Sequence, residues 1–238
     1  VPYIGAWIIG ADGMQSLVRK WAGLHPSRRE NRRFGFRRHF RVRPWTDFVE
    51  VYWGSSCQIA VTPTADDEVG LAMISRNPNL RIHDALREVP VLAAHVAGAE
   101  ASTSERGAPC VLRRLPALSR GSVALLGDAS GSVDPITGEG LGLAFRQAVA
   151  LAEALRGDDL SSYESAHRRI GRVPYRMSQL ILWMDSNAWL RQRALRALAA
   201  EPHLFARLLN AQVENNSAPL FPAGLLDAMR LGYRLARL

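Results

Sequence analysis

The segment from residue 122 to residue 155 constrains the fold more than any other part of the sequence. A short apolar run typical of a buried strand, Ser122–Leu126, is followed by Gly127 and Asp128 and by a glycine-rich loop. An alanine-rich helix, apolar almost all round and therefore expected to be buried, is predicted over Leu141–Leu155. A helix N-terminus offers unpaired N–H groups and a partial positive charge, and small residues let a ligand approach that backbone. This order predicts a site for a ligand with hydroxyl groups and an electron-rich edge. A plain strand–loop–helix crossover with a tight turn is the alternative.

A second strand followed by an aspartate occurs near the start of the sequence. The continuous apolar run Ile4–Ala11 predicts a buried strand, and Asp12-Gly13 predicts a turn. Ser16 is placed to cap a short helix predicted over Ser16–Trp21. Taken alone, an Asp-Gly turn with a helix cap explains this segment better than a ligand site does.

The residues between these two segments change to the alternation of β-strands. From about Phe34 to Ser75 the pattern predicts an antiparallel meander, after an arginine-rich connector over residues 25–33; the strands are expected at 40–43, 48–53, 58–62 and 69–74. Four apolar residues are expected on one face of this sheet, as sheet core or as ligand contacts: Val49, Val51, Trp53 and Ile59. Helices broken near Pro90 are predicted over Leu80–Gly98, a strand over Cys110–Leu115, and helices after Leu160.

Composition excludes several classes of protein. The charge is 30 − 22 = +8, but Lys20 is the only lysine, so the excess reflects a bias toward arginine and no nucleic-acid reader motif accompanies it. Cys57 and Cys110 share no CxxC spacing and the six histidines show no ligand pairing, so no metal site is expected. No apolar run approaches the roughly 20 residues of a transmembrane helix. We therefore expect a cytoplasmic protein with no nucleic-acid partner and no transmembrane segment.

The two strand–aspartate segments together resemble a known family. Gly10–Arg19 and Leu125–Gly142 are similar to the Asp-Gly and Gly-Asp motifs of FAD-dependent flavoprotein monooxygenases of the para-hydroxybenzoate hydroxylase type. The form Gly-Asp-Ala-Ser-Gly with Pro-Ile-Thr-Gly-Glu-Gly is most similar to the geranylgeranyl reductase-like branch. The separation of 128 − 12 = 116 residues leaves room for the inserted sheet domain of such proteins, and the Tyr163–Arg169 segment also resembles the family.

This resemblance implies a fold and a domain order. The expected fold class is α/β (α+β), with a partial FAD-binding Rossmann-like domain interrupted by an antiparallel β-sheet substrate domain and followed by C-terminal helices. The expected boundaries are 1–24 and 109–160 for the FAD-binding parts, 25–108 for the sheet domain and 161–238 for the helices.

The resemblance also implies cofactors and a site. FAD would be reduced by NAD(P)H, Asp128 would bind the ribityl chain, Pro135 would lie beside the flavin ring, and backbone N–H groups of Thr137–Gly142 would face the flavin edge. Asp12 and its neighbours would support the middle of the cofactor. The full set of expected cofactor-binding residues is Asp12, Gly13, Gly127, Asp128, Pro135, Thr137, Gly138, Glu139, Gly140, Leu141 and Gly142. No catalytic acid or base is identified.

The implied function is an FAD-dependent oxidoreductase. It would carry out monooxygenation, by hydroxylation or epoxidation, or alkene reduction of a small apolar organic or isoprenoid-like substrate. The family's GxGxxG unit, which holds the pyrophosphate, is absent: Gly138-x-Gly140 is followed by Leu143 where the third glycine would stand. We therefore expect a fragment lacking an N-terminal strand–helix–strand unit. The alternative is a non-catalytic truncated remnant that does not hold FAD.

Two charged segments each have two interpretations. The arginine cluster could attract a nicotinamide phosphate or an acidic substrate, but a solvated connector and strand edge is the simpler explanation; its members are Arg28, Arg29, Arg32, Arg33, Arg37, Arg38, Arg41 and Arg43. Gly224–Leu238 forms an amphipathic pattern that could make peripheral membrane contact, although docking on the protein's own body is favoured.

Overall fold

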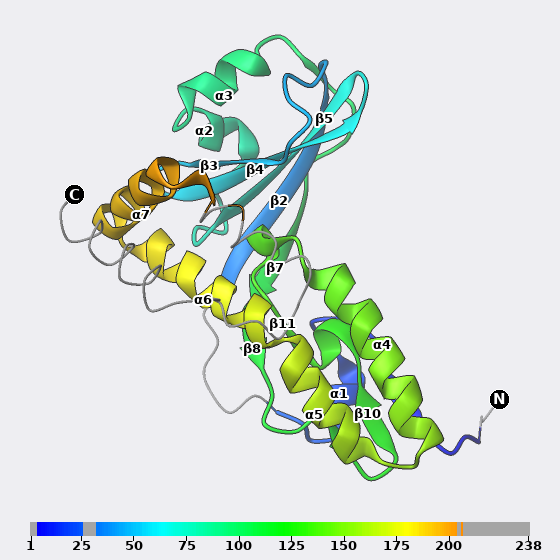
Figure 1. Ribbon diagram of the computed structural model, residues 1–238. Helices are drawn as coiled ribbons and strands as arrows, with labels where there is room; N and C mark the ends of the chain where they lie inside the picture. Colours follow the sequence, from blue (N-terminus) through cyan, green and yellow to red (C-terminus); the bar gives the residue numbers. More distant parts are fainter. Residues whose placement is uncertain (1–3, 26–31, 204–205, 207–238) are drawn as a thin grey trace. The chain divides into compact units, whose positions relative to one another are not determined.

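The computed structural model describes residues 4–25, 32–203 and 206, and these form two compact units (Figure 1). Of these residues, one unit, here called the helical unit, comprises 4–25, 113–133, 137–203 and 206. The other, the sheet unit, comprises 32–112 together with 134–136. The mixed α/β architecture, with an antiparallel sheet and C-terminal helices, confirms the expected fold class in this general form.

The helical unit is built on a small sheet with strand order β1-β10-β9. Strand β1 (Ile8–Gly10) pairs in parallel with β10 (Val123–Leu125), which pairs antiparallel with β9 (Ser119–Arg120). A separate two-stranded ladder joins β8 (Arg113–Arg114) to β11 (Gly131–Ser132). The parallel pair thus brings together two chain segments that are far apart in the sequence.

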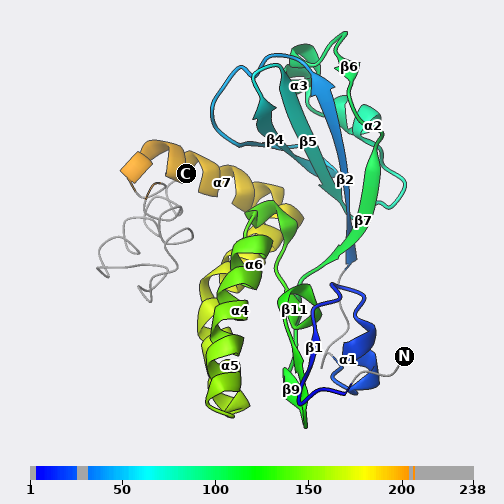
Figure 2. The same cartoon turned by 90° about the vertical axis from the view of Figure 1, so that its right-hand side faces the viewer.

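Helices pack around this small sheet. Helix α1 (Leu17–Trp21) follows β1, and α4 (Gly140–Arg156) and α5 (Leu160–Ile170) lie side by side, as Figures 1 and 2 both show. Helices α6 (Arg172–Ser186) and α7 (Ala188–Ala200) continue the chain. The core contains Leu24, Leu115, Leu118, Ala124, Leu125, Leu151, Ala154 and Tyr163. The helical pattern after Leu160 is therefore confirmed up to Ala200, whereas Gly224–Leu238 lies outside the described residues.

Two expectations about burial in this unit were wrong. Strand β1 has three residues rather than the eight expected, and the Ile8 side chain is 57% exposed, because among the described residues only β10 pairs with β1. Helix α4 is not buried all round: Leu141, Phe145 and Val149 are exposed. They recur every fourth residue and so form one stripe, on a different side of the helix from the buried stripe that includes Leu143 and Leu151.

The sheet unit contains a six-stranded sheet in which β3, β4, β5, β2 and β6 follow one another and β7 also pairs with β2. The strands are β2 (Arg32–Arg41), β3 (Glu50–Trp53), β4 (Cys57–Ala65), β5 (Glu68–Ser75), β6 (Glu100–Ala101) and β7 (Arg106–Val111). The expected simple meander holds only for β3–β4–β5. Strand β2 is long enough to pair with β5 on one side and with β6 and β7 on the other, so it lies inside the sheet.

Two short helices cover one face of this sheet (Figures 1 and 2). Helix α2 (Ile82–Leu86) and helix α3 (Pro90–His95) confirm the predicted break near Pro90, which takes a first-turn position of α3, where its missing N–H is tolerated. They pack over a core that includes Val61, Val69, Leu71, Met73 and Leu92.

Ile59 lies on the opposite face from the one expected. It pairs with Tyr52, and its side chain is fully buried in the core under α2 and α3. Val51 and Trp53 alternate with Tyr52 along β3, so they point to the other face. The expectation that Ile59 shares a face with Val51 and Trp53 was therefore wrong.

The helices that the structure describes include none long and apolar enough to cross a membrane.

Candidate functional site

The structure brings the two strand–aspartate segments together at one edge of the small sheet. Gly10 is the register partner of Leu125, and the Leu126 N–H donates to the Gly10 carbonyl at 2.9 Å. Asp12 and Asp128 therefore follow the carboxyl ends of neighbouring parallel strands, where ligands of open α/β sheets bind. Glycine is required at position 10, since a Cβ there would lie 2.8 Å from the Leu125 side chain.

Asp12 uses its carboxylate to begin helix α1. One of its oxygens, Oδ2, accepts hydrogen bonds from the N–H groups of Leu17 at 2.7 Å and Val18 at 3.2 Å. Hydrogen bonding to the Ser16 side chain and to these N–H groups lowers the pKa of Asp12. Ser16 itself accepts from the Arg19 N–H at 2.9 Å, as expected of a cap. The turn-and-cap interpretation of this segment is the one that the geometry supports.

Asp128 has no such partner. It lies in the short helix η1 (Gly127–Ala129), where it accepts no hydrogen bond from the residues that the structure describes. Asp128 is exposed to solvent on one side; desolvation by the atoms around it raises its pKa, and the nearby Arg113 guanidinium acts in the opposite direction. Gly127 has φ +60°, a left-handed conformation that favours glycine. The turn thus presents a carboxylate that accepts no hydrogen bond from the described residues.

A buried polar network supports this turn from within the helical unit. Ser130 Oγ lies 2.7 Å from the Gly127 carbonyl and 2.8 Å from His167 Nε2, and the Gly127 N–H donates to Gln147 at 3.0 Å. Tyr163 donates its hydroxyl to the Leu125 carbonyl at 2.7 Å. Burial lowers the pKa of His167 to about 4, so the ring is neutral at pH 7. Ser130 donates its hydroxyl proton to the Gly127 carbonyl. The neutral His167 ring therefore donates its Nε2–H to Ser130 Oγ.

Arg19 links the two segments directly. Its buried guanidinium donates to the Ala129 carbonyl at 2.9 Å and to the Met14 carbonyl at 2.7 Å. Arg113 also donates to the Met14 carbonyl. Neither Arg19 nor His167 is among the site residues predicted from the sequence. For His167 a signal existed, because it stands four residues after Tyr163 on the same helix face; an arginine in a short helix carries none.

The loop before α4 leaves its backbone open. The short helix η2 (Pro135–Thr137) precedes Gly138, whose φ is +69°, and α4 begins at Gly140 with no side-chain cap at Glu139. A Cβ added at Gly138 or Gly140 would meet nothing within 4 Å. Glu139 instead pairs with Arg146 at 3.1 Å. Uncapped N–H groups beside open glycine backbone fit a ligand with an electron-rich edge.

The predicted site residues thus fall into three groups. Asp12, Gly13, Gly127 and Asp128 lie at the edge of the small sheet, and α4, which begins at Gly140, packs against η1. Thr137–Glu139 form the loop before α4, and Leu141 and Gly142 lie in its exposed first turn. Pro135 begins η2 and belongs to the sheet unit. In the described part of the chain no three His, Cys, Asp or Glu side chains cluster in a way that could hold a metal ion.

Comparisons with known proteins complete the description of this site. A family model described as "FAD binding domain" matches residues 5–170. The chain is 30% identical over 180 residues to 2-heptyl-3-hydroxy-4(1H)-quinolone synthase of Mycobacteroides abscessus, in an alignment that covers 68% of this chain and 48% of that protein. The chain therefore spans about half the length of the curated relative it matches.

Solved structures show the same fold. The flavin-dependent halogenase BrvH from Brevundimonas sp. BAL3 has a TM-score of 0.61 at 13% identity, over 98% of this chain and 49% of its own. The probable FAD-dependent monooxygenase PqsL from Pseudomonas aeruginosa has a TM-score of 0.52 at 24% identity, over 76% of this chain and 54% of its own.

Proposed function

The chain belongs to the FAD binding domain family, and from this premise we propose that its Gly-Asp turn and the start of α4 hold the flavin half of FAD. One observation carries the proposal. Asp128 presents a carboxylate without a hydrogen-bond partner among the described residues, and α4, with its uncapped N-terminus and the open backbone of Gly138 and Gly140, packs against the same turn.

Each part has a distinct role in this proposal. The Asp128 carboxylate accepts hydrogen bonds from the ribityl hydroxyls. The N–H groups of Gly140, Leu141 and Gly142 favour negative charge at the flavin edge. Asp12 acts indirectly, by capping α1 and so fixing Arg19, which holds the Ala129 carbonyl. When bound, FAD supplies the hydride and oxygen chemistry, while the protein orients it.

We propose NAD(P)H-driven monooxygenation of a small apolar organic molecule as the reaction of the whole enzyme. The description of PqsL as a probable FAD-dependent monooxygenase supports the choice of monooxygenation, and its complex with 2-aminobenzoylacetate supports a small organic substrate. Alkene reduction, suggested by the Thr137–Gly140 sequence alone, differs in a measurable way. A monooxygenase consumes O₂ with NAD(P)H, whereas an alkene reductase works without O₂.

Flavin titration of the purified chain tests the proposal. The sequence contains no GxGxxG pyrophosphate motif, so the site holds the flavin half alone, and riboflavin should bind about as tightly as FAD. Quenching of flavin fluorescence, and visible flavin bands that remain after desalting, are the expected results. Failure of both flavins to bind would contradict the proposal and favour the non-catalytic alternative. Asp66→Asn, an exposed change in the β4–β5 turn, is the matched control for Asp128→Asn.

A further inference from the structure

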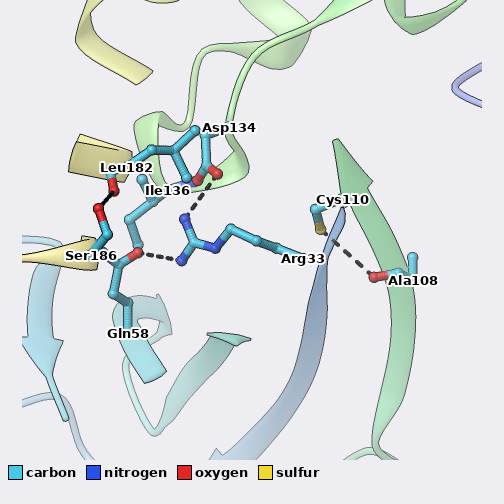
Figure 3. A network of polar contacts seen from close by, with 8 residues as sticks. All are labelled: Arg33, Gln58, Ala108, Cys110, Asp134, Ile136, Leu182 and Ser186. Atoms are coloured by element: carbon cyan, nitrogen blue, oxygen red, sulfur yellow. Dashed lines mark hydrogen bonds and ion pairs between the residues drawn. The ribbon is translucent and has the colours of Figure 1, made fainter. Parts of the chain in front are cut away.

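The sheet unit contains a buried ion pair that the proposed flavin contacts do not explain. Arg33 in β2 and Asp134 lie 2.9 Å apart, between Nη1 and Oδ2, and each side chain is only 3% exposed (Figure 3). The second terminal nitrogen of Arg33 donates to Gln58 Oε1 at 2.7 Å. The arginine cluster expected to be a solvated connector thus contains one member that is buried and paired.

This network occupies the sheet face opposite α2 and α3. Gln58 is the register partner of Trp53, and its side chain points to the face opposite that of Ile59. Because an arginine can only donate, its bond to Gln58 Oε1 fixes which way that amide points. Strand β4 therefore orients Gln58, Gln58 helps to orient Arg33, and Arg33 reaches Asp134, 101 residues away in the sequence.

Asp134 joins the sheet to the loop that leads to α4. Its Oδ2 binds Arg33, while its Oδ1 accepts the N–H of Ile136 at 3.2 Å and so closes the turn around Pro135. In Figure 3 the dashed line from Arg33 reaches the Asp134 carboxylate. One carboxylate therefore fixes both the place of the turn on the sheet and its local conformation.

Stability alone does not account for this arrangement. Arg33 Nε and Gln58 Nε2 are buried without a hydrogen-bond partner, and unpaired buried donors are costly. Apolar side chains of similar volume often stabilise a fold as well as a buried ion pair does. An ion pair also holds its two side chains in one geometry. Here it holds Asp134, which lies in the turn just before Thr137–Gly142.

We propose that Arg33 and Asp134 are positioning residues, which hold the Pro135 turn on the sheet in one conformation so that the loop into α4 is prepared to receive the flavin. The flavin part of this inference rests on the proposed function; the anchoring of the turn does not. The pair acts through the backbone of the turn and does not itself contact the cofactor.

The test uses Arg33→Met in the full chain, with hydrogen–deuterium exchange as the readout. This variant leaves both partners of the Asp134–Ile136 hydrogen bond in place and removes the two contacts of the Arg33 guanidinium, with Asp134 and with Gln58. Exchange of the Ile136 and Leu143 amides, which donate to the Asp134 carboxylate and to the Glu139 carbonyl, should rise about ten-fold, the scale of one lost charged hydrogen bond, while β4 and β5 keep their protection. Riboflavin affinity should fall along with it. Arg87→Met, which breaks an exposed pair with Asp84 in the same unit, is the control and should change neither.

Arg33→Lys keeps the proposal testable if Arg33→Met unfolds the sheet. It preserves the buried positive charge but loses the planar fork that bonds Asp134 and Gln58 together. We expect β4 and β5 to remain protected, the Ile136 and Leu143 amides to exchange faster than in the wild type, and flavin affinity to fall while the variant still unfolds in one cooperative transition. Unchanged exchange at Ile136 and Leu143 in a folded Arg33→Lys protein overturns the inference. A wild-type chain that binds no flavin counts against the proposed function alone, because the exchange data still decide the role of the pair.

Discussion

Asp12 and Asp128 occupy the same place after two neighbouring parallel strands, yet they differ in what their carboxylates bind. Asp12 accepts hydrogen bonds from the N–H groups of Leu17 and Val18, and its pKa is lowered. Asp128 accepts none from the described residues, and desolvation by the surrounding atoms raises its pKa. The Asp12 carboxylate therefore serves the fold, whereas we propose that the Asp128 carboxylate serves a ligand.

The distance along the chain to the next helix explains this difference. Helix α1 begins at Leu17, five residues after Asp12, so a short turn brings its first N–H groups to that carboxylate. Helix α4 begins at Gly140, twelve residues after Asp128, and the intervening loop carries the chain through η1, β11 and η2. Among the described residues Asp128 accepts no N–H of α4, and the side chain of Glu139, the residue before that helix, does not cap it.

The largest expected effect is a loss of stability at low pH caused by His167, which contacts Ser130 beside the Asp128 turn. His167 has a pKa of about 4 in the fold against 6.5 for an ordinary histidine, because burial disfavours its charged form. The stability it contributes is fully present above pH 6.5 and is lost as the pH falls toward 4, by roughly 3 kcal/mol in total. Urea unfolding at several pH values measures this loss. His167→Gln should flatten the dependence over that range, and an equally steep dependence in the variant would show that other groups cause it.

The next effect separates the two aspartates by ligand binding. Asp128→Asn should weaken riboflavin and FAD binding about 10- to 100-fold, since hydrogen bonds to a charged group are worth roughly 1.5–3 kcal/mol. The free energy of unfolding should not fall, because the folded protein disfavours the charged form of Asp128. Flavin fluorescence titration and urea unfolding of the same preparation measure both quantities. A stable variant with wild-type flavin affinity would remove Asp128 from the site.

The smallest effect should appear at Asp12, with the opposite signature. Asp12→Ala removes the carboxylate that begins α1 and should cost about 1 kcal/mol of stability, the usual value for a lost helix cap. Ser16→Ala, which removes the other capping side chain, should cost a similar amount. Flavin affinity should change much less than in Asp128→Asn. An equal loss of flavin affinity in Asp12→Ala would mean that both aspartates bind the ligand, and would contradict a purely structural role for Asp12.

Local signals were sufficient for the order of elements and for much of the candidate site. The strand–Gly-Asp–loop–helix segment, the break at Pro90 and the helices after Leu160 follow from apolar periodicity and from glycine and proline, which act within a few residues. The same signals failed where burial depends on neighbours. The apolar α4 was predicted to be buried all round, but only one stripe of it has a partner among the described residues.

By itself, the sequence determined the two aspartate turns, the open glycines before α4 and the family to which the chain belongs, because each of these is encoded in a short contiguous stretch. Only the tertiary structure decided which aspartate accepts hydrogen bonds from the first N–H groups of a helix, which face of the sheet Ile59 lies on and where β2 lies in its sheet. It also distinguished Arg19 and Arg33 from the other arginines, since their partners Ala129 and Asp134 lie 110 and 101 residues away. A side chain acquires such a role from what the folded chain brings against it, and residue type and spacing do not carry that information.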